Sequence, residues 1–129
     1  MNNPFVYGPD EPPAILLKPQ HLYRAGMSGL TLYDITRGVW KVNLRRVSRA
    51  QLAFSVADGK VVGVFDIEGW HLANTTPYVS GRQDQSDPKY SGRFEFTGKP
   101  SSMSQKYLGQ VVVFGPGRQE LRYLNCSLH

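Results

Sequence analysis

The sequence contains a single cysteine, Cys126, among 129 residues. A lone cysteine cannot form a disulfide within the chain, and it excludes zinc sites built from paired CxxC ligands. We expect Cys126 to be a small buried or near-terminal apolar residue, and we expect no metal and no bound cofactor. The lack of paired cysteines is typical of proteins in a reducing cytosol.

Long hydrophobic runs are also missing. No apolar stretch approaches the roughly 20 residues that a membrane-spanning helix needs. The residues from Met1 to Phe5 lack a charged segment followed by an apolar one, which is the pattern of a secretory signal. We therefore expect a cytoplasmic protein with no membrane partner.

Acidic residues are absent from one interval, between Asp34 and Asp58. The same interval holds five cations: Arg37, Lys41, Arg45, Arg46 and Arg49. The whole chain has a formal net charge of +5, so the charges outside this interval balance. Localised positive charge attracts polyanions over about 8 to 10 Å at ordinary ionic strength. The interval therefore predicts an anion-binding surface, with an ordinary solvated surface as the alternative.

The composition predicts one globular domain. Apolar residues make up 40% of the chain, aromatic residues 12% and charged residues 19%, which excludes wholesale disorder. Five of the nine prolines lie in the first twenty residues. They predict a proline-rich N-terminal arm over residues 1–20, with at most one edge strand at Ala14–Leu17. Residues 21–129 form the predicted domain.

Residues 28–40 fit either a helix or a strand. Ser28 suits the N-cap of a helix in which Leu32, Ile35 and Val39 share one face, whereas the β-branched and aromatic content favours a strand. Residues 52–67 are clearer, because two β-rich runs flank Asp58-Gly59 and this pair tolerates the positive φ angles of a hairpin turn.

Alternation along the second strand of this hairpin predicts its two faces. Val62, Val64 and Asp66 should point one way, and Val61, Gly63, Phe65 and Ile67 the other. Glycine inside such a run indicates a bulge or a close backbone approach. The strand should end over residues 68–71.

The C-terminal half alternates between loops and short elements. We expect a long polar loop over 74–92, a strand over 93–97, a helix over 99–109 and strands over 111–114 and 121–124. Pro100 or a serine would begin the helix, and Gly109 would end it. The predicted fold is a β-rich α+β domain, either a small twisted barrel or a curved sheet of five to seven strands with one or two short helices.

Catalytic patterns are weak. The three histidines, His21, His71 and His129, accompany no GxSxG-type nucleophile turn. Asp87, Glu95 and Lys99 follow one another near a predicted strand, but their spacing does not fit a metal-dependent nuclease. Glu95 lies between Phe94 and Phe96, so alternation predicts that it faces solvent.

Aromatic residues are interleaved with the cations of the basic interval. Cations attract phosphates, an aromatic ring can stack on an unpaired base, and a carboxylate can accept hydrogen bonds from a base edge. Trp40 fits a core position as well as a ligand site. Trp70, at a strand end before a polar loop, fits a pocket as well as the core.

Three segments and an arginine pair together resemble a known superfamily. They are 32–40 (LYDITRGVW), Arg45-Arg46, 53–70 (AFSVADGKVVGVFDIEGW) and 122–126 (RYLNC). They look like a bacterial module of the PUA-like superfamily, which also includes the ASCH, EVE and YTH domains. The long loop over 74–92 has no clear counterpart in that pattern.

The resemblance implies a small twisted β-barrel that binds RNA, or DNA with a modified base. It implies a pocket for one flipped base. The implied pocket residues are Tyr33, Trp40 and Trp70, with Asp34 or Ser80 reading the base edge. The implied contacts to the nucleic-acid backbone are Arg37, Lys41, Arg45, Arg46 and Arg49.

The leading hypothesis is a non-enzymatic nucleic-acid-binding module, and one form of this hypothesis has it recognise a modified or flipped base. The alternative is a protein-interaction or small-ligand-sensing regulatory subunit, in which the hairpin edge or the proline-rich arm docks a protein partner. A further alternative is an enzyme acting on nucleic acid or a nucleotide, with Asp34, His71 or Asp87 as the acid–base group.

Overall fold

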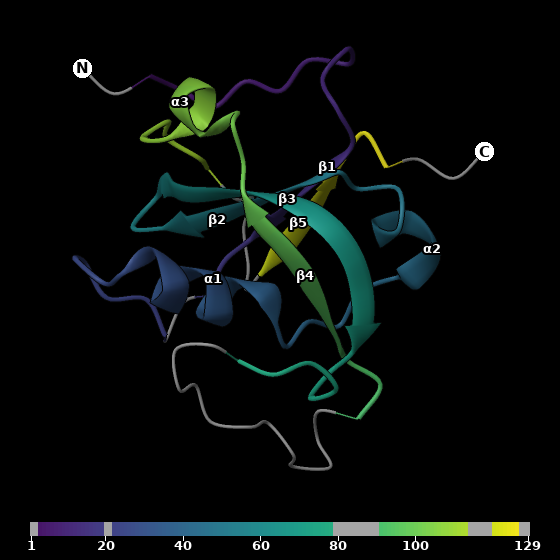
Figure 1. Cartoon of the computed structure of the whole chain (residues 1–129). Helices are drawn as coiled ribbons and strands as arrows, with labels where there is room; N and C mark the ends of the chain where they lie inside the picture. Colours follow the sequence, from purple (N-terminus) through teal and green to yellow (C-terminus); the bar gives the residue numbers. More distant parts are fainter. Residues whose placement is uncertain (1–2, 20–21, 79–90, 114–119, 127–129) are drawn as a thin grey trace.

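A computed structural model of the chain describes residues 3–19, 22–78, 91–113 and 120–126. Its elements, in chain order, are β1 (Ala14–Leu17), α1 (Gly29–Arg37), α2 (Leu44–Val47), β2 (Leu52–Ala57), β3 (Lys60–Leu72), β4 (Phe94–Pro100), α3 (Ser104–Tyr107) and β5 (Leu121–Leu124) (Figure 1). No helix in these ranges is long and apolar enough to cross a membrane.

The strands of the described ranges form one mixed sheet in the order β4-β3-β2-β1-β5. β1 and β2 are parallel, and the other neighbouring strands are antiparallel. β3 is long and strongly bent (Figure 1). The fold is therefore a small α+β domain compatible with the predicted curved sheet, with three short helices in its described part where one or two were expected.

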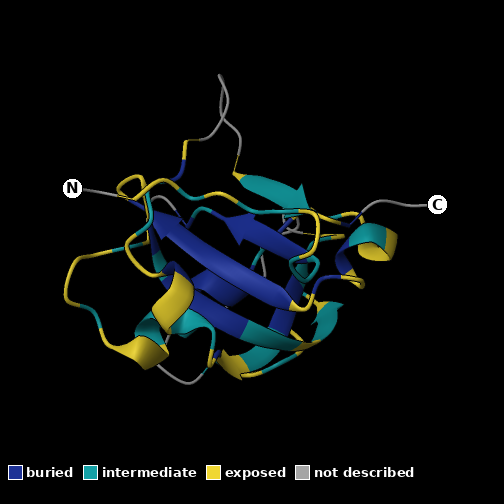
Figure 2. Cartoon of the chain, turned by 90° about the horizontal axis from the view of Figure 1, so that it is seen from above, coloured by how far each residue is buried: buried dark blue, intermediate teal, exposed yellow. Residues whose placement is uncertain are grey.

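Apolar side chains from the sheet form two clusters. One contains Phe54, Val64 and Tyr107, with Phe5 and Tyr7 of the N-terminal segment packed against it. The other contains Ile15, Trp40, Val47, Phe65 and Phe96. The sheet is the most deeply buried part of the molecule (Figure 2). Cys126 is 1% exposed and belongs to the second cluster, which confirms its predicted buried position.

β1 is an interior strand, so the prediction of an edge strand was wrong. It pairs with β2 on one side and β5 on the other, and all four of its residues are buried. An unbroken apolar run suits a strand that is covered on both faces. Pro13 and Pro19 lie outside the strand, so neither interrupts its hydrogen bonds.

The helix alternative for residues 28–40 is the correct one. Ser28 caps α1, because its Oγ accepts a hydrogen bond from the backbone N–H of Thr31 at 3.1 Å. Leu32 and Ile35 face the interior, but the helix ends at Arg37, so Val39 lies beyond it.

The Asp58-Gly59 hairpin is confirmed, with φ angles of 52° and 73° at its two turn residues. Its predicted face pattern is wrong at Val61, which packs with Val64 in the first cluster. The cause is a register shift that leaves Val62 without a partner opposite it on β2. Gly63 is also a close approach, because a Cβ there would lie 2.9 Å from Leu32 Cδ2.

The C-terminal elements agree with the predictions in part. β4 and β5 occur where strands were expected, and β3 runs to Leu72, beyond its predicted end. Pro100 ends β4 and does not begin a helix, so α3 is shorter than the helix expected over 99–109. In the described part of 111–114, Val111 forms only isolated bridges, to Pro4 and Lys60.

Candidate functional site

The residues predicted to bind nucleic acid separate into an interior group and a surface group. Asp34, Arg37 and Trp40 are 0%, 1% and 6% exposed. Lys41, Arg45 and Arg49 are exposed. Ser80 lies outside the described residues, as does most of the loop predicted over 74–92.

Arg37 is held between two buried carboxylates. Its Nε lies 3.5 Å from Asp34 Oδ1, and its Nη1 lies 3.4 Å from Glu95 Oε2. The guanidinium also donates to Thr76 Oγ1 at 2.6 Å and lies 4.1 Å from the centre of the Tyr78 ring. Arg37 and Asp34 are thus part of the interior. The predictions that Arg37 contacts a phosphate and that Asp34 reads a base edge were therefore wrong.

Glu95 is fully buried, so the prediction that it faces solvent was wrong. Residues 74–76 cover it, and its carboxylate accepts hydrogen bonds from the backbone N–H groups of Asn74 and Thr76 at 2.6 and 2.9 Å, and from the Thr76 hydroxyl. Burial by itself raises the pKa of Glu95. The hydrogen bonds from Thr76 and Asn74 and the positive charge of Arg37 lower this pKa by more than burial raises it, so the net shift is downward.

Trp40 and Tyr33 pack in the interior cluster that also contains Phe96. The indole Nε1 of Trp40 donates a hydrogen bond to the backbone oxygen of Thr36 at 2.7 Å, so the one polar group of this side chain is satisfied within the core. The Tyr33 hydroxyl accepts a hydrogen bond from Gly98 N at 2.9 Å, and its ring contacts Phe65 and Phe96. The choice left open for Trp40 is therefore resolved in favour of the core.

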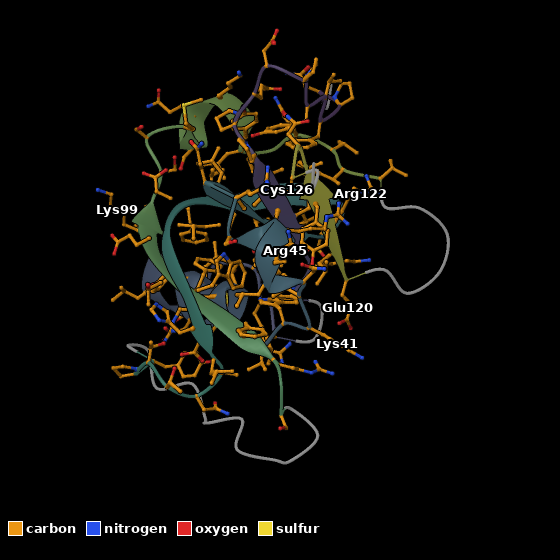
Figure 3. The ribbon with its side chains drawn as sticks, turned by 90° about the vertical axis from the view of Figure 1, so that its right-hand side faces the viewer. Lys41, Arg45, Lys99, Glu120, Arg122 and Cys126 are labelled. Carbon is orange, nitrogen blue, oxygen red and sulfur yellow. The ribbon has the colours of Figure 1, made fainter. Side chains whose placement is uncertain are left out.

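The surface group surrounds the short helix α2. Asn43 caps this helix by accepting a hydrogen bond from Arg46 N at 3.1 Å. Arg46 lies against the Tyr123 ring, with its guanidinium carbon 4.1 Å from the ring centre. Lys41, Arg45 and Arg49, called the basic face below, form no ion pair within the described ranges. Lys41 and Arg45 lie on the side of the molecule seen in Figure 3.

A pocket of about 430 Å³ lies between α2 and the second half of β3. Its walls on the α2 side are Leu44, Arg45, Ser48 and Ala50. Its walls on the β3 side are Ile67, Glu68, Gly69 and Trp70. We call it the Trp70 pocket. Arg45 belongs to both the pocket and the basic face, so the two form one continuous site.

The pocket exists because β3 is longer than β2. The pairing of the two strands ends at Leu52 and Asp66, and Ile67 N makes one further hydrogen bond, to Gln51 O. Past Ile67, the described strands pair with β3 only on its β4 side. The β4 ladder also shifts register between Ile67 and Gly69, which leaves Glu68 as a bulge. A bulge explains how four consecutive strand residues line one pocket, since regular strands alternate.

Among the predicted base-pocket residues that the structure describes, only Trp70 lines this pocket. Its ring packs edge-on against Phe96, with 5.4 Å between ring centres. Its Nε1 is buried and has no hydrogen-bond partner among the described residues. Buried indole N–H groups normally have a partner, so this donor is an exception within the described part of the chain. Leu44, Ser48 and Glu68 were missed, because they come from α2 and β3, which lie together only in the folded structure.

The acid–base candidates do not form a catalytic group in the described chain. His71 Nε2 is 3.0 Å from Thr97 Oγ1, and Asp34 is paired with Arg37. Asp87 lies outside the described residues. No cluster of three His, Cys, Asp or Glu side chains suited to a metal ion occurs in the ranges that the structure describes.

Comparison of the chain with protein-family models, with curated proteins and with solved structures found no match.

Proposed function

We propose that this protein binds single-stranded nucleic acid without catalysing a reaction on it. The phosphates lie on the basic face of Lys41, Arg45 and Arg49, and one base enters the Trp70 pocket. The observation that carries the proposal is that Arg45 belongs both to an aromatic pocket and to a group of exposed cations that form no ion pair with any described residue.

The chemistry of the pocket supports a planar, partly apolar ligand. Leu44, Ala50, Ile67 and Trp70 supply apolar walls, and the volume of about 430 Å³ lies within the range typical of small-molecule sites. Stacking of a base on an aromatic side chain contributes about 1–3 kcal/mol. Cations beside such a wall fit a ligand that has both a base and a phosphate.

We also propose that the fold belongs with the PUA-like modules. The curved mixed sheet, with helices packed on it, supports this assignment. The proposed base site differs from the one that the resemblance implied, because Tyr33, Asp34 and Trp40 are replaced by Leu44, Glu68 and Ser48 around Trp70.

The test is a titration of single-stranded and duplex RNA and DNA at several salt concentrations, followed by tryptophan fluorescence. Binding to single strands should weaken with salt along a log-log slope of about −0.7 for each phosphate contacted. Affinity that does not change between low and moderate salt, or equal binding to duplexes, would overturn the proposal.

A matched pair of lysine substitutions sharpens this test. Lys41→Gln should weaken binding and reduce the salt slope by about one phosphate contact. Lys99→Gln removes the same charge from an exposed lysine that lies away from Lys41 and Arg45 (Figure 3), and it should leave both the affinity and the slope nearly unchanged. Equal effects of the two substitutions would contradict a localised basic site.

A further inference from the structure

One residue of the site has the wrong charge for a surface that only binds phosphates. Glu68 is exposed and lines the Trp70 pocket together with Arg45. Its carboxylate forms no ion pair with any residue in the described ranges. A carboxylate repels phosphodiester oxygens, so an acidic residue at the pocket favours a ligand group that donates hydrogen bonds.

The local backbone places Glu68 at the pocket. Glu68 is the bulge residue of β3, and its neighbours Ile67 and Gly69 also line the pocket. Bulges turn a side chain away from the direction that regular alternation would give it. Arg45 lines the pocket from α2, so one basic and one acidic residue, from two different elements, border the pocket together with Trp70.

We propose that the Trp70 pocket selects guanine, with Glu68 and Arg45 reading two adjacent edges of the base; this inference rests on the function proposed above. Guanine presents two neighbouring donors, N1–H and the N2 amino group, which match the two oxygens of a carboxylate. Its O6 and N7 are two neighbouring acceptors, which match the forked donors of an arginine.

The other bases fit this pair of side chains less well. Adenine and cytosine place a ring-nitrogen acceptor beside their amino group, so one carboxylate oxygen would face a lone pair. Uracil and thymine have a single N–H between two carbonyl groups. Adenine also offers arginine a donor beside N7, where guanine offers the acceptor O6. Guanine alone complements both charged groups.

The experiment compares nine-residue oligouridines that differ only in the central base, which is guanine, adenine, cytosine or hypoxanthine. The guanine strand should bind about tenfold more tightly than the adenine strand, because a bidentate contact discriminates by about that factor. Hypoxanthine lacks the 2-amino group and should lose most of this advantage. Equal affinity for the four strands, with a normal salt slope, overturns the guanine inference and leaves nucleic-acid binding intact.

Two glutamate substitutions and a free nucleoside complete the design. Glu68→Gln should abolish the preference for guanine while the salt slope persists. Glu120→Gln removes the same charge from an exposed glutamate outside the pocket and should keep the preference. A preference retained in Glu68→Gln overturns the inference. If guanosine binds as tightly as the guanine strand and salt has no effect, guanine reading stands and the proposed nucleic-acid function fails.

Discussion

Arg37 Nη1 lies 3.4 Å from Glu95 Oε2, and the two side chains are only 2% and 0% exposed. The pair joins the last turn of α1 to β4. Glu95 also accepts hydrogen bonds from the backbone N–H groups of Asn74 and Thr76. The same two residues therefore hold the helix, the sheet edge and the segment that follows β3.

Removing Arg37 should strongly destabilise the protein. Arg37→Met removes the guanidinium that pairs with the buried Glu95 and Asp34, and breaking a buried pair in this way costs about 3–5 kcal/mol. Urea unfolding followed by circular dichroism measures the loss. The control is Arg45→Met, which removes an exposed arginine and should change stability by less than about 0.5 kcal/mol. Equal losses in the two variants would contradict the buried network.

Glu95 should make the protein sensitive to acid. Its pKa in the folded state lies below the ordinary value of 4.5, so the unfolded chain binds a proton more readily. Its contribution to stability is therefore complete above pH 4.5 and is lost as the pH falls through the folded-state pKa. The free energy of unfolding, measured from pH 6 to pH 3, should fall less steeply in Glu95→Gln than in the wild type. Parallel curves would show that another group is responsible.

Local turn chemistry explains why the hairpin could be predicted. Asp58 and Gly59 tolerate positive φ angles, and a two-residue turn sets the register of its strands without help from the rest of the chain. The interior position of β1 depends on pairing with β2 and β5, which are distant in sequence. No local pattern contains that information.

The site was predicted in part for the same reason. The charge pattern located the cations, but it did not distinguish Arg37, which α1 turns inward, from Lys41, which lies on the surface. Alternation placed Glu95 opposite Phe96, yet it could not show that residues 74–76 cover that face. Trp70 was identified as a pocket candidate, whereas its neighbours in the pocket come from α2, whose packing on β3 is a tertiary feature.

The two tryptophans should respond differently to ligand and to quenchers. Trp40→Phe leaves Trp70 as the only tryptophan, and tryptophan fluorescence should change when nucleic acid binds. Trp70→Phe leaves Trp40, which is 6% exposed and hydrogen-bonded to Thr36. The fluorescence of this variant should be quenched little by acrylamide and should not change when the ligand binds. A ligand response of equal size in Trp70→Phe would place the binding site elsewhere.

Gly98 should not tolerate a side chain. A Cβ at this position would overlap the backbone oxygen of Asp66 in the neighbouring strand, which cannot move without breaking the β3–β4 ladder. Gly98→Ala should therefore cost about 3 kcal/mol or more. Gly29→Ala is the matched control, because a Cβ there meets nothing within 4 Å, and alanine in the first turn of α1 should be neutral or slightly stabilising. Thermal unfolding of both variants checks this contrast.

Because β3 is longer than β2, its two halves are under different structural constraints. The first half of β3, up to Asp66, pairs with β2 and contributes Val61, Val64 and Phe65 to the core, whereas residues 69–72 pair on the β4 side alone within the described sheet. Under the function proposed above, substitutions at the exposed Glu68 would therefore change ligand selection without altering the packing on which folding depends. Homologous or engineered chains could diversify their ligands along this overhang while keeping the same scaffold.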